Sequence, residues 1–211
     1  MVAGAVTALA AWAGFVLGSG STGWLVAGLV LTLLFGFVAF FFRDPRHPLP
    51  ADPAAVLAPG QGRVVDIREV DEPTFFGGAC RRISIFLTIF DVHVQRAPVS
   101  GVVEHRTYRP GTYAVAWLEK ASEDNEQASL GITTSRGKVL VRQIAGLVAR
   151  RIVTDPSEGD RIERGSRIGL IRFGSRVDLF LPLDWEVTCA VGDRAVAGLT
   201  TLARQPALVS G

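Results

Sequence analysis

Charged residues are absent from the first 42 positions of this chain, although its 211 residues include 22 Lys or Arg and 20 Asp or Glu. Residues 43–211 hold all of these charges and contain no comparable apolar run, which excludes a transporter with many membrane spans. A hydrophobic content of 48% excludes an intrinsically disordered protein. The net charge of +2 is too small to indicate a nucleic-acid partner.

The chain is also poor in lysine, cysteine and histidine. Its two lysines stand against 20 arginines, an imbalance explained either by genome composition or by arginines that meet phosphate groups. Cys80 and Cys189 belong to no metal-binding or redox spacing, so we expect two reduced core residues in a cytosolic compartment. No two of the three histidines have the spacing of zinc ligands, and no metal site is predicted.

The uncharged N-terminal stretch is too long for one membrane span. A single helix through its 42 residues would reach about 63 Å, roughly twice the hydrocarbon thickness of a bilayer. Gly18–Gly23 is a helix-breaking cluster that divides the stretch into apolar segments at Val2–Leu17 and Trp24–Phe42. The pattern predicts a transmembrane helical hairpin, or one span together with an interfacial helix.

The charges that follow indicate the orientation. Arg43 and Arg46 come directly after the second segment, and the positive-inside rule places them in the cytoplasm. A cleaved signal peptide would need a positive region before its apolar run, which is missing here. We therefore expect a membrane anchor over residues 1–43 and a domain over residues 44–211 on the cytoplasmic face of the cell membrane.

Residues 56–203 are predicted to be β-rich. Short runs of β-branched and apolar residues alternate with glycine and proline, and no stretch has a helical period long enough for a βαβ unit. This pattern is typical of an all-β sandwich or barrel. The expected strands are Arg63–Ile67, Arg82–Phe86, Gly101–Tyr108, Tyr113–Trp117, Leu130–Thr134, Lys138–Ile144, Arg167–Ile171 and Val177–Leu181.

One turn narrows this fold class. Gly159–Gly165 resembles the turn of biotinyl and lipoyl carrier domains, where a strand crosses between small sheets. The resemblance implies a mainly β domain of the barrel-sandwich type. Neither Lys120 nor Lys138 has the Met-Lys-Met setting of a carrier lysine, so a swinging-arm carrier is not expected.

Two short segments are candidates for chemistry. Strand alternation would place Asp91, His93 and Gln95 on one face, which forms either a solvated sheet surface or the lining of a site. Gly174-Ser175 stands between two apolar runs and indicates a β-bulge or a tight turn. The chain has no Gly-x-Ser-x-Gly elbow, so a hydrolase serine is not indicated.

Several motifs together point to one family. In chain order they are Phe41–Pro45, Asp91–Val94 with Arg96–Gly101, Asn125–Glu126, Val141–Leu147 with Ala149–Ile152, and Arg172–Asp178. Each is weak alone, but the set covers residues 41–182 and follows an apolar anchor. The sequence resembles the short, membrane-associated phosphatidylserine decarboxylases, which are pyruvoyl-dependent carboxy-lyases made as zymogens.

The resemblance implies self-cleavage between Gly174 and Ser175. The Ser175 hydroxyl would attack the Gly174 carbonyl, and β-elimination of the resulting ester would yield a β chain of residues 1–174 and an α chain of residues 175–211. Position 175 would become a pyruvoyl group, a covalent cofactor whose ketone forms a Schiff base with the substrate amine and accepts electrons. A glycine before the serine permits the close backbone approach that this step needs.

The resemblance also implies roles for other residues. His93 would protonate the carbanion left by decarboxylation, because its ordinary pKa of about 6.5 suits proton transfer near neutral pH. Asp91 would orient it or supply the carboxylate for self-cleavage. The candidates for binding the substrate phosphate are Arg142, Arg150, Arg151 and Arg172, although a surface ion pair is the commoner role for any single arginine.

The expected partners are therefore the phospholipid and its membrane, together with the chain's own two cleavage products, and a homo-oligomer stays open. An ether lipid with a serine head group is an alternative substrate for the same chemistry. A third reading is an unprocessed, non-catalytic lipid-binding module. It rests on a departure from the family, which usually has Pro-Ala-Asp-Gly where this chain has Pro59-Gly60-Gln61-Gly62.

Overall fold

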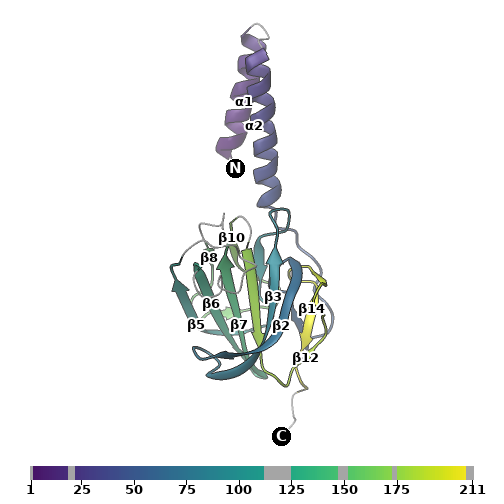
Figure 1. The fold of residues 1–211 in the computed structure, drawn as a ribbon. Coiled ribbons are helices and arrows are strands. Elements are labelled where there is room, and N and C mark those ends of the chain that lie inside the picture. The colour runs from purple at the N-terminus through teal and green to yellow at the C-terminus, as the bar shows by residue number, and fades with distance from the viewer. Residues whose placement is uncertain (1, 19–21, 112–124, 147–151, 173–174, 208–211) are drawn as a thin grey trace. The chain divides into compact units, whose positions relative to one another are not determined.

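The computed structural model describes residues 2–18, 22–111, 125–146, 152–172 and 175–207. The chain divides into two compact units, residues 1–43 and residues 44–211. The first unit is helical and the second is built from β-strands (Figure 1). The mainly β prediction is confirmed, since no helix follows residue 43 in the part of the chain that the structure describes.

The first unit consists of α1 (Val2–Leu17) and α2 (Thr22–Phe41), close to the bounds that the sequence predicts. The two helices contact each other where the Trp12 indole donates to the Thr32 hydroxyl at 3.0 Å. Gly28 allows this approach, because a Cβ there would lie 3.3 Å from the Trp12 ring. By length and composition, α2 is the one helix among the described residues that could cross a membrane.

The second unit is centred on one eight-stranded antiparallel sheet, with the strand order β13-β2-β3-β11-β7-β6-β5-β9. The bounds of these strands in that order are Arg194–Ala195, Gly62–Glu72, Gly78–Leu87, Ser175–Leu181, Gly137–Ala145, Gln127–Thr134, Gly101–Arg109 and Arg161–Ile162. Two three-stranded sheets accompany it, β4-β10-β8 and β1-β14-β12. Their strands are Val94–Arg96, Arg167–Ile171, Ile152–Thr154, Ala55–Leu57, Thr201–Arg204 and Glu186–Val187.

Seven of the eight expected strands lie within strands of the structure, and β10 has the expected bounds. The eighth, Tyr113–Trp117, lies outside the described residues. The structure extends the expected strands at β2 and β3, which form a long antiparallel hairpin.

The core lies on one face of the large sheet. On β11, Val177, Leu179 and Leu181 are fully buried and face a cluster of apolar side chains. The residues between them face the other way, where Phe180 packs with a smaller apolar cluster. The sheet β4-β10-β8 lies against the main core face, because Gln95 of β4 and Thr154 of β8 both hydrogen-bond to Gln143 of β7.

Both cysteines are free thiols in the structure, as the sequence predicts. Cys80 is buried and Cys189 is half-buried. Burial raises the pKa of each thiol to about 11. Both side chains are therefore protonated and poorly nucleophilic at neutral pH.

A buried ion pair ties the β2–β3 hairpin to the outer face of β7. The Glu72 carboxylate accepts from Arg142 at 2.8 Å and from the backbone N–H groups of Phe75 and Phe76. Burial alone would raise the pKa of Glu72. A hydrogen bond from the Thr74 hydroxyl, the two backbone hydrogen bonds and the charge of Arg142 together outweigh burial, so the pKa lies below its ordinary value.

We expect Glu72→Gln to destabilise the chain by about 1–3 kcal/mol at pH 7, because Arg142 loses its buried partner. A carboxylate whose pKa is lowered by folding stabilises the fold at pH values above its pKa in the unfolded chain, about 4.3. This stabilisation is lost as the pH falls through its pKa in the folded chain. The difference in the free energy of unfolding between wild type and variant should therefore become smaller in acid. Urea unfolding at pH 7 and near pH 3 measures this difference, and a difference that does not depend on pH would contradict the assignment.

Candidate active site

Ser175 lies at the end of the large sheet where β3 and β7 finish. It is the first residue of β11, and its strand partners are Leu87 and Ala145, the last residues of β3 and β7. The side chain is fully buried, and its hydroxyl has no hydrogen-bond partner among the described residues. A buried hydroxyl without a hydrogen bond costs free energy of folding, and such groups are uncommon in proteins. The Ser175 hydroxyl therefore marks a candidate site.

Asn125 and Glu126 lie on the other side of Ala145. The Ala145 N–H donates to the Glu126 carbonyl at 3.0 Å, and the Asn125 amide donates to the Ala145 carbonyl at 2.7 Å. The pairing of β6 with β7 therefore continues to this row, so Glu126, Ala145 and Ser175 cross the end of three adjacent strands. The sequence shows Asn125–Glu126 only as a motif, and tertiary pairing brings it beside Ser175.

His93 lies in the loop before β4 and is fully buried. Its carbonyl accepts from the Ile171 N–H at 3.3 Å. Ser175 follows Ile171 by four positions, so the chain holds the backbone of Ser175 within about 14 Å of the backbone of Ile171. The imidazole Nδ1 lies 2.9 Å from the Asp91 carbonyl oxygen and is therefore its donor. This leaves Nε2 as the ring nitrogen whose protonation can change.

The strand predicted through Asp91, His93 and Gln95 is wrong in part, because only Val94–Arg96 forms β4. Asp91 lies in a bend, where its carboxylate accepts from the Thr88 N–H at 2.8 Å and pairs with Arg194. Turn geometry overrides alternation here because an Asp side chain can bind the backbone of its own turn. Asp91 therefore reaches His93 through its carbonyl and not through its carboxylate.

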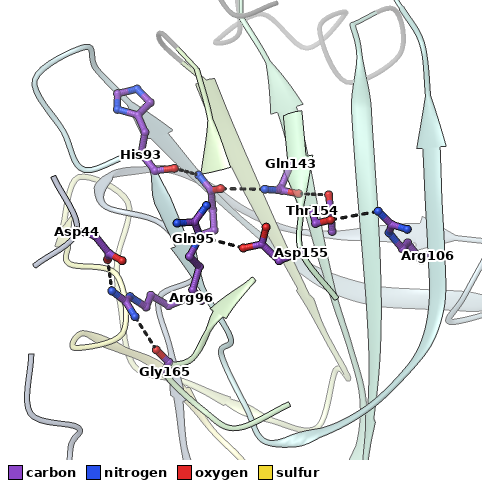
Figure 2. Close-up of polar contacts among 10 residues, drawn as sticks. Asp44, His93, Gln95, Arg96, Arg106, Gln143, Thr154, Asp155 and Gly165 are labelled. Carbon is purple, nitrogen blue, oxygen red and sulfur yellow. Dashed lines mark hydrogen bonds and ion pairs between the residues drawn. The ribbon is translucent and has the colours of Figure 1, made fainter. Parts of the chain in front are cut away.

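A chain of buried amides continues from His93 toward β8 (Figure 2). Gln95 donates to the His93 carbonyl at 2.7 Å, Gln143 donates to Gln95 at 2.8 Å, and the Thr154 hydroxyl donates to Gln143 at 2.8 Å. The imidazole itself points away from this chain (Figure 2). Because each amide is held by two partners, the network fixes the backbone that carries His93.

The segment that departs from the family motif packs beside the same strand ends. A Cβ at Gly60 would lie 3.3 Å from Val177 and 3.5 Å from Leu87, which flank Ser175 along β11 and across to β3. Gln61, the next residue, is half-buried. The side chain at position 61 therefore belongs to a segment next to Ser175 and has no carboxylate to offer.

The four candidate phosphate ligands differ in their surroundings. Arg142 points to the outer face of β7, where it pairs with Glu72 and its guanidinium carbon lies 4.8 Å from the Phe180 ring centre. Arg172 is exposed and directly follows β10. Arg150 and Arg151 lie outside the described residues, as does Gly174. Of the two described candidates, Arg172 is exposed, whereas Arg142 is half-buried and already paired with Glu72.

Comparison with models of known protein families identifies the family of this chain. The model of phosphatidylserine decarboxylase matches residues 34–203, which include Ser175, His93 and Glu126. The chain belongs to the phosphatidylserine decarboxylase family. The resemblance seen in the motifs is thereby confirmed, and the chain is an enzyme of the decarboxylating lyase class.

Curated relatives of this family match over nearly the whole chain. The phosphatidylserine decarboxylase proenzyme of Symbiobacterium thermophilum is 50% identical over 204 residues, which are 96% of this chain and 92% of the relative. The proenzyme of Salinibacter ruber is 50% identical and covers 89% of this chain and 86% of its own length. The proenzyme of Saccharopolyspora erythraea is 48% identical over 85% and 78%.

Proposed function

We propose that this decarboxylase converts phosphatidylserine to phosphatidylethanolamine at the cytoplasmic surface of the membrane, after cleaving itself between Gly174 and Ser175. The observation that carries the proposal is the buried Ser175 hydroxyl without a partner, at the first position of β11 and within the region that matches the family. Its relatives are named as proenzymes, which agrees with an activating cleavage.

Ser175 supplies the nucleophile for cleavage. Its Oγ adds to the carbonyl carbon of Gly174, the Ser175 nitrogen leaves, and an ester replaces the amide. Loss of the Ser175 Cα proton then expels the Gly174 carboxylate and leaves a dehydroalanine, which takes up water and releases ammonia to become the pyruvoyl group. The hydroxyl fits this role because no described residue competes for it.

A pyruvoyl ketone supplies an electron sink for decarboxylation of an amine substrate. The protein's own groups provide the rest. His93 holds its Nδ1 proton against the Asp91 carbonyl, so Nε2 can deliver a proton to the substrate carbon that has lost CO2. Asp91 acts as a positioning residue, because its carboxylate secures the Thr88–Asp91 bend that presents this carbonyl.

The substrate explains the first unit of the chain. A lipid head group must be met at the bilayer surface, and α2 is long enough to hold the enzyme there. We place α1 and α2 in the membrane as a hairpin, with residues 44–211 as a barrel-sandwich domain on the cytoplasmic side. Arg172 is the proposed phosphate ligand, because it is exposed and lies between Ile171 and the cleavage site.

Purified wild-type chain should convert to fragments of residues 1–174 and 175–211, the second with a blocked N-terminus. Ser175→Ala should stay intact because the nucleophile is gone, and Ser135→Ala, at an exposed position, should cleave normally. Mass spectrometry of denatured protein measures all three. Intact wild-type chain after prolonged incubation would refute the proposal and favour the non-catalytic module that Gln61 suggests.

His93→Ala should lower CO2 release per cleaved chain by about 10²–10⁴-fold, the usual contribution of a general acid, while the cleaved fraction changes little. His105→Ala is the matched control, since that ring stacks on Phe75, 5.6 Å between centres, away from the His93 loop. Normal release per cleaved chain would remove His93 from the mechanism. Normal release with cleavage abolished would assign it to maturation.

Removal of residues 1–42 should leave a folded β domain that acts slowly on phosphatidylserine in vesicles and normally on a short-chain, water-soluble analogue. The reason is that the anchor contributes access to the lipid and no part of the β core. Circular dichroism and both rates test this. Loss of β-structure, or equal rates on vesicles with and without the anchor, would contradict it.

A further inference from the structure

Glu126 is a second buried group with an unpaired atom at the same end of the sheet. Its side chain is 3% exposed, and Oε2 has no hydrogen-bond partner among the described residues. Oε1 accepts from the Tyr108 hydroxyl at 3.1 Å and from the Ile152 N–H at 3.3 Å. Two donors therefore fix the carboxylate by one oxygen and leave the other without a donor.

Strand register places this carboxylate on the same face as Ser175. Ser175 and Ala145 are direct partners, so their side chains share a face. Glu126 stands opposite Ala145, one position before the Gln127–Ile144 pair. Because side chains alternate along a strand, Glu126 and Ala128 share a face, and Ala128 belongs to the main core. Two strand spacings separate the backbones of Glu126 and Ser175, about 10 Å.

Ala145 stands between them and is fully buried, with a single methyl group as its side chain. Side chains from both sides can therefore reach a small group held over Ala145. A buried carboxylate oxygen without a donor costs free energy in the empty site, and this cost is recovered only when a donor arrives. The donor best matched to it is a cation with several N–H bonds.

We propose that Glu126 binds the ammonium group of the serine head group through Oε2 and holds it over Ala145, facing position 175. This inference rests on the proposed function and deepens it, because it names the residue that selects an amine for the reaction. Tyr108 and Ile152 already hold Oε1, so Oε2 is the oxygen that would accept from the amine.

The test compares processed wild-type enzyme with Glu126→Gln, which keeps the shape and removes the charge. Glu126→Gln should cleave as wild type does, and its kcat/KM for phosphatidylserine per cleaved chain should fall about 10–100-fold, the loss expected for a charge-assisted hydrogen bond. Hydroxylamine, an amine largely uncharged in neutral buffer, should add to the carbonyl at position 175 at the wild-type rate. The mass of the 175–211 fragment measures this addition.

Glu72→Gln is the matched control, because it also removes a buried carboxylate from this domain but on the outer side of β7. It should leave the ratio of phosphatidylserine turnover to hydroxylamine capture unchanged. Unchanged turnover in Glu126→Gln would overturn the proposal and mean that solvent satisfies Oε2. Loss of cleavage or of hydroxylamine capture would overturn it in favour of a role in maturation or folding. Failure of the wild type to cleave would instead refute the proposed function.

Discussion

The antiparallel register of β11 with β3 and β7 is the constraint on which the site depends. It ends β3 at Leu87 and β7 at Ala145 on the two sides of Ser175, so the proposed nucleophile is the first residue of a strand buried between two others. A one-residue slip would turn the Ser175 side chain to the outer face, where Arg176 and Asp178 form a buried bidentate ion pair. The same register therefore aligns the core and places the Ser175 side chain on the core face.

Polar groups buried around this row have two kinds of surroundings. Gln95, Gln143 and Thr154 satisfy one another and form a rigid support under His93. Ser175 and Glu126 each keep one oxygen without a partner among the described residues. A satisfied network stabilises and an unsatisfied atom costs free energy, so the contrast separates the groups that hold the site from those available for chemistry.

In the proposed mechanism, self-cleavage and decarboxylation draw on different residues of the site. Cleavage needs a nucleophile aligned with its own backbone before substrate arrives, and Ser175 is held for this by two strands. Catalysis needs groups that meet the substrate afterwards, and His93 comes from the loop before β4 while Glu126 precedes β6. Because the two sets come from different segments, the proposed cleavage before Ser175 would leave the other side chains of the site in place.

The sequence by itself determined the uncharged helices, most of the strands and the cleavage motif, because these depend on local composition and on short-range alternation. It also singled out His93 and Ser175. It misplaced Asp91, whose turn hydrogen bonds override strand alternation, and it left Glu126 without a role. Only the tertiary structure decided that Glu126 and Ser175 share a row and that Arg142 points away from it, because strand register joins residues far apart in the chain and no local pattern encodes that pairing.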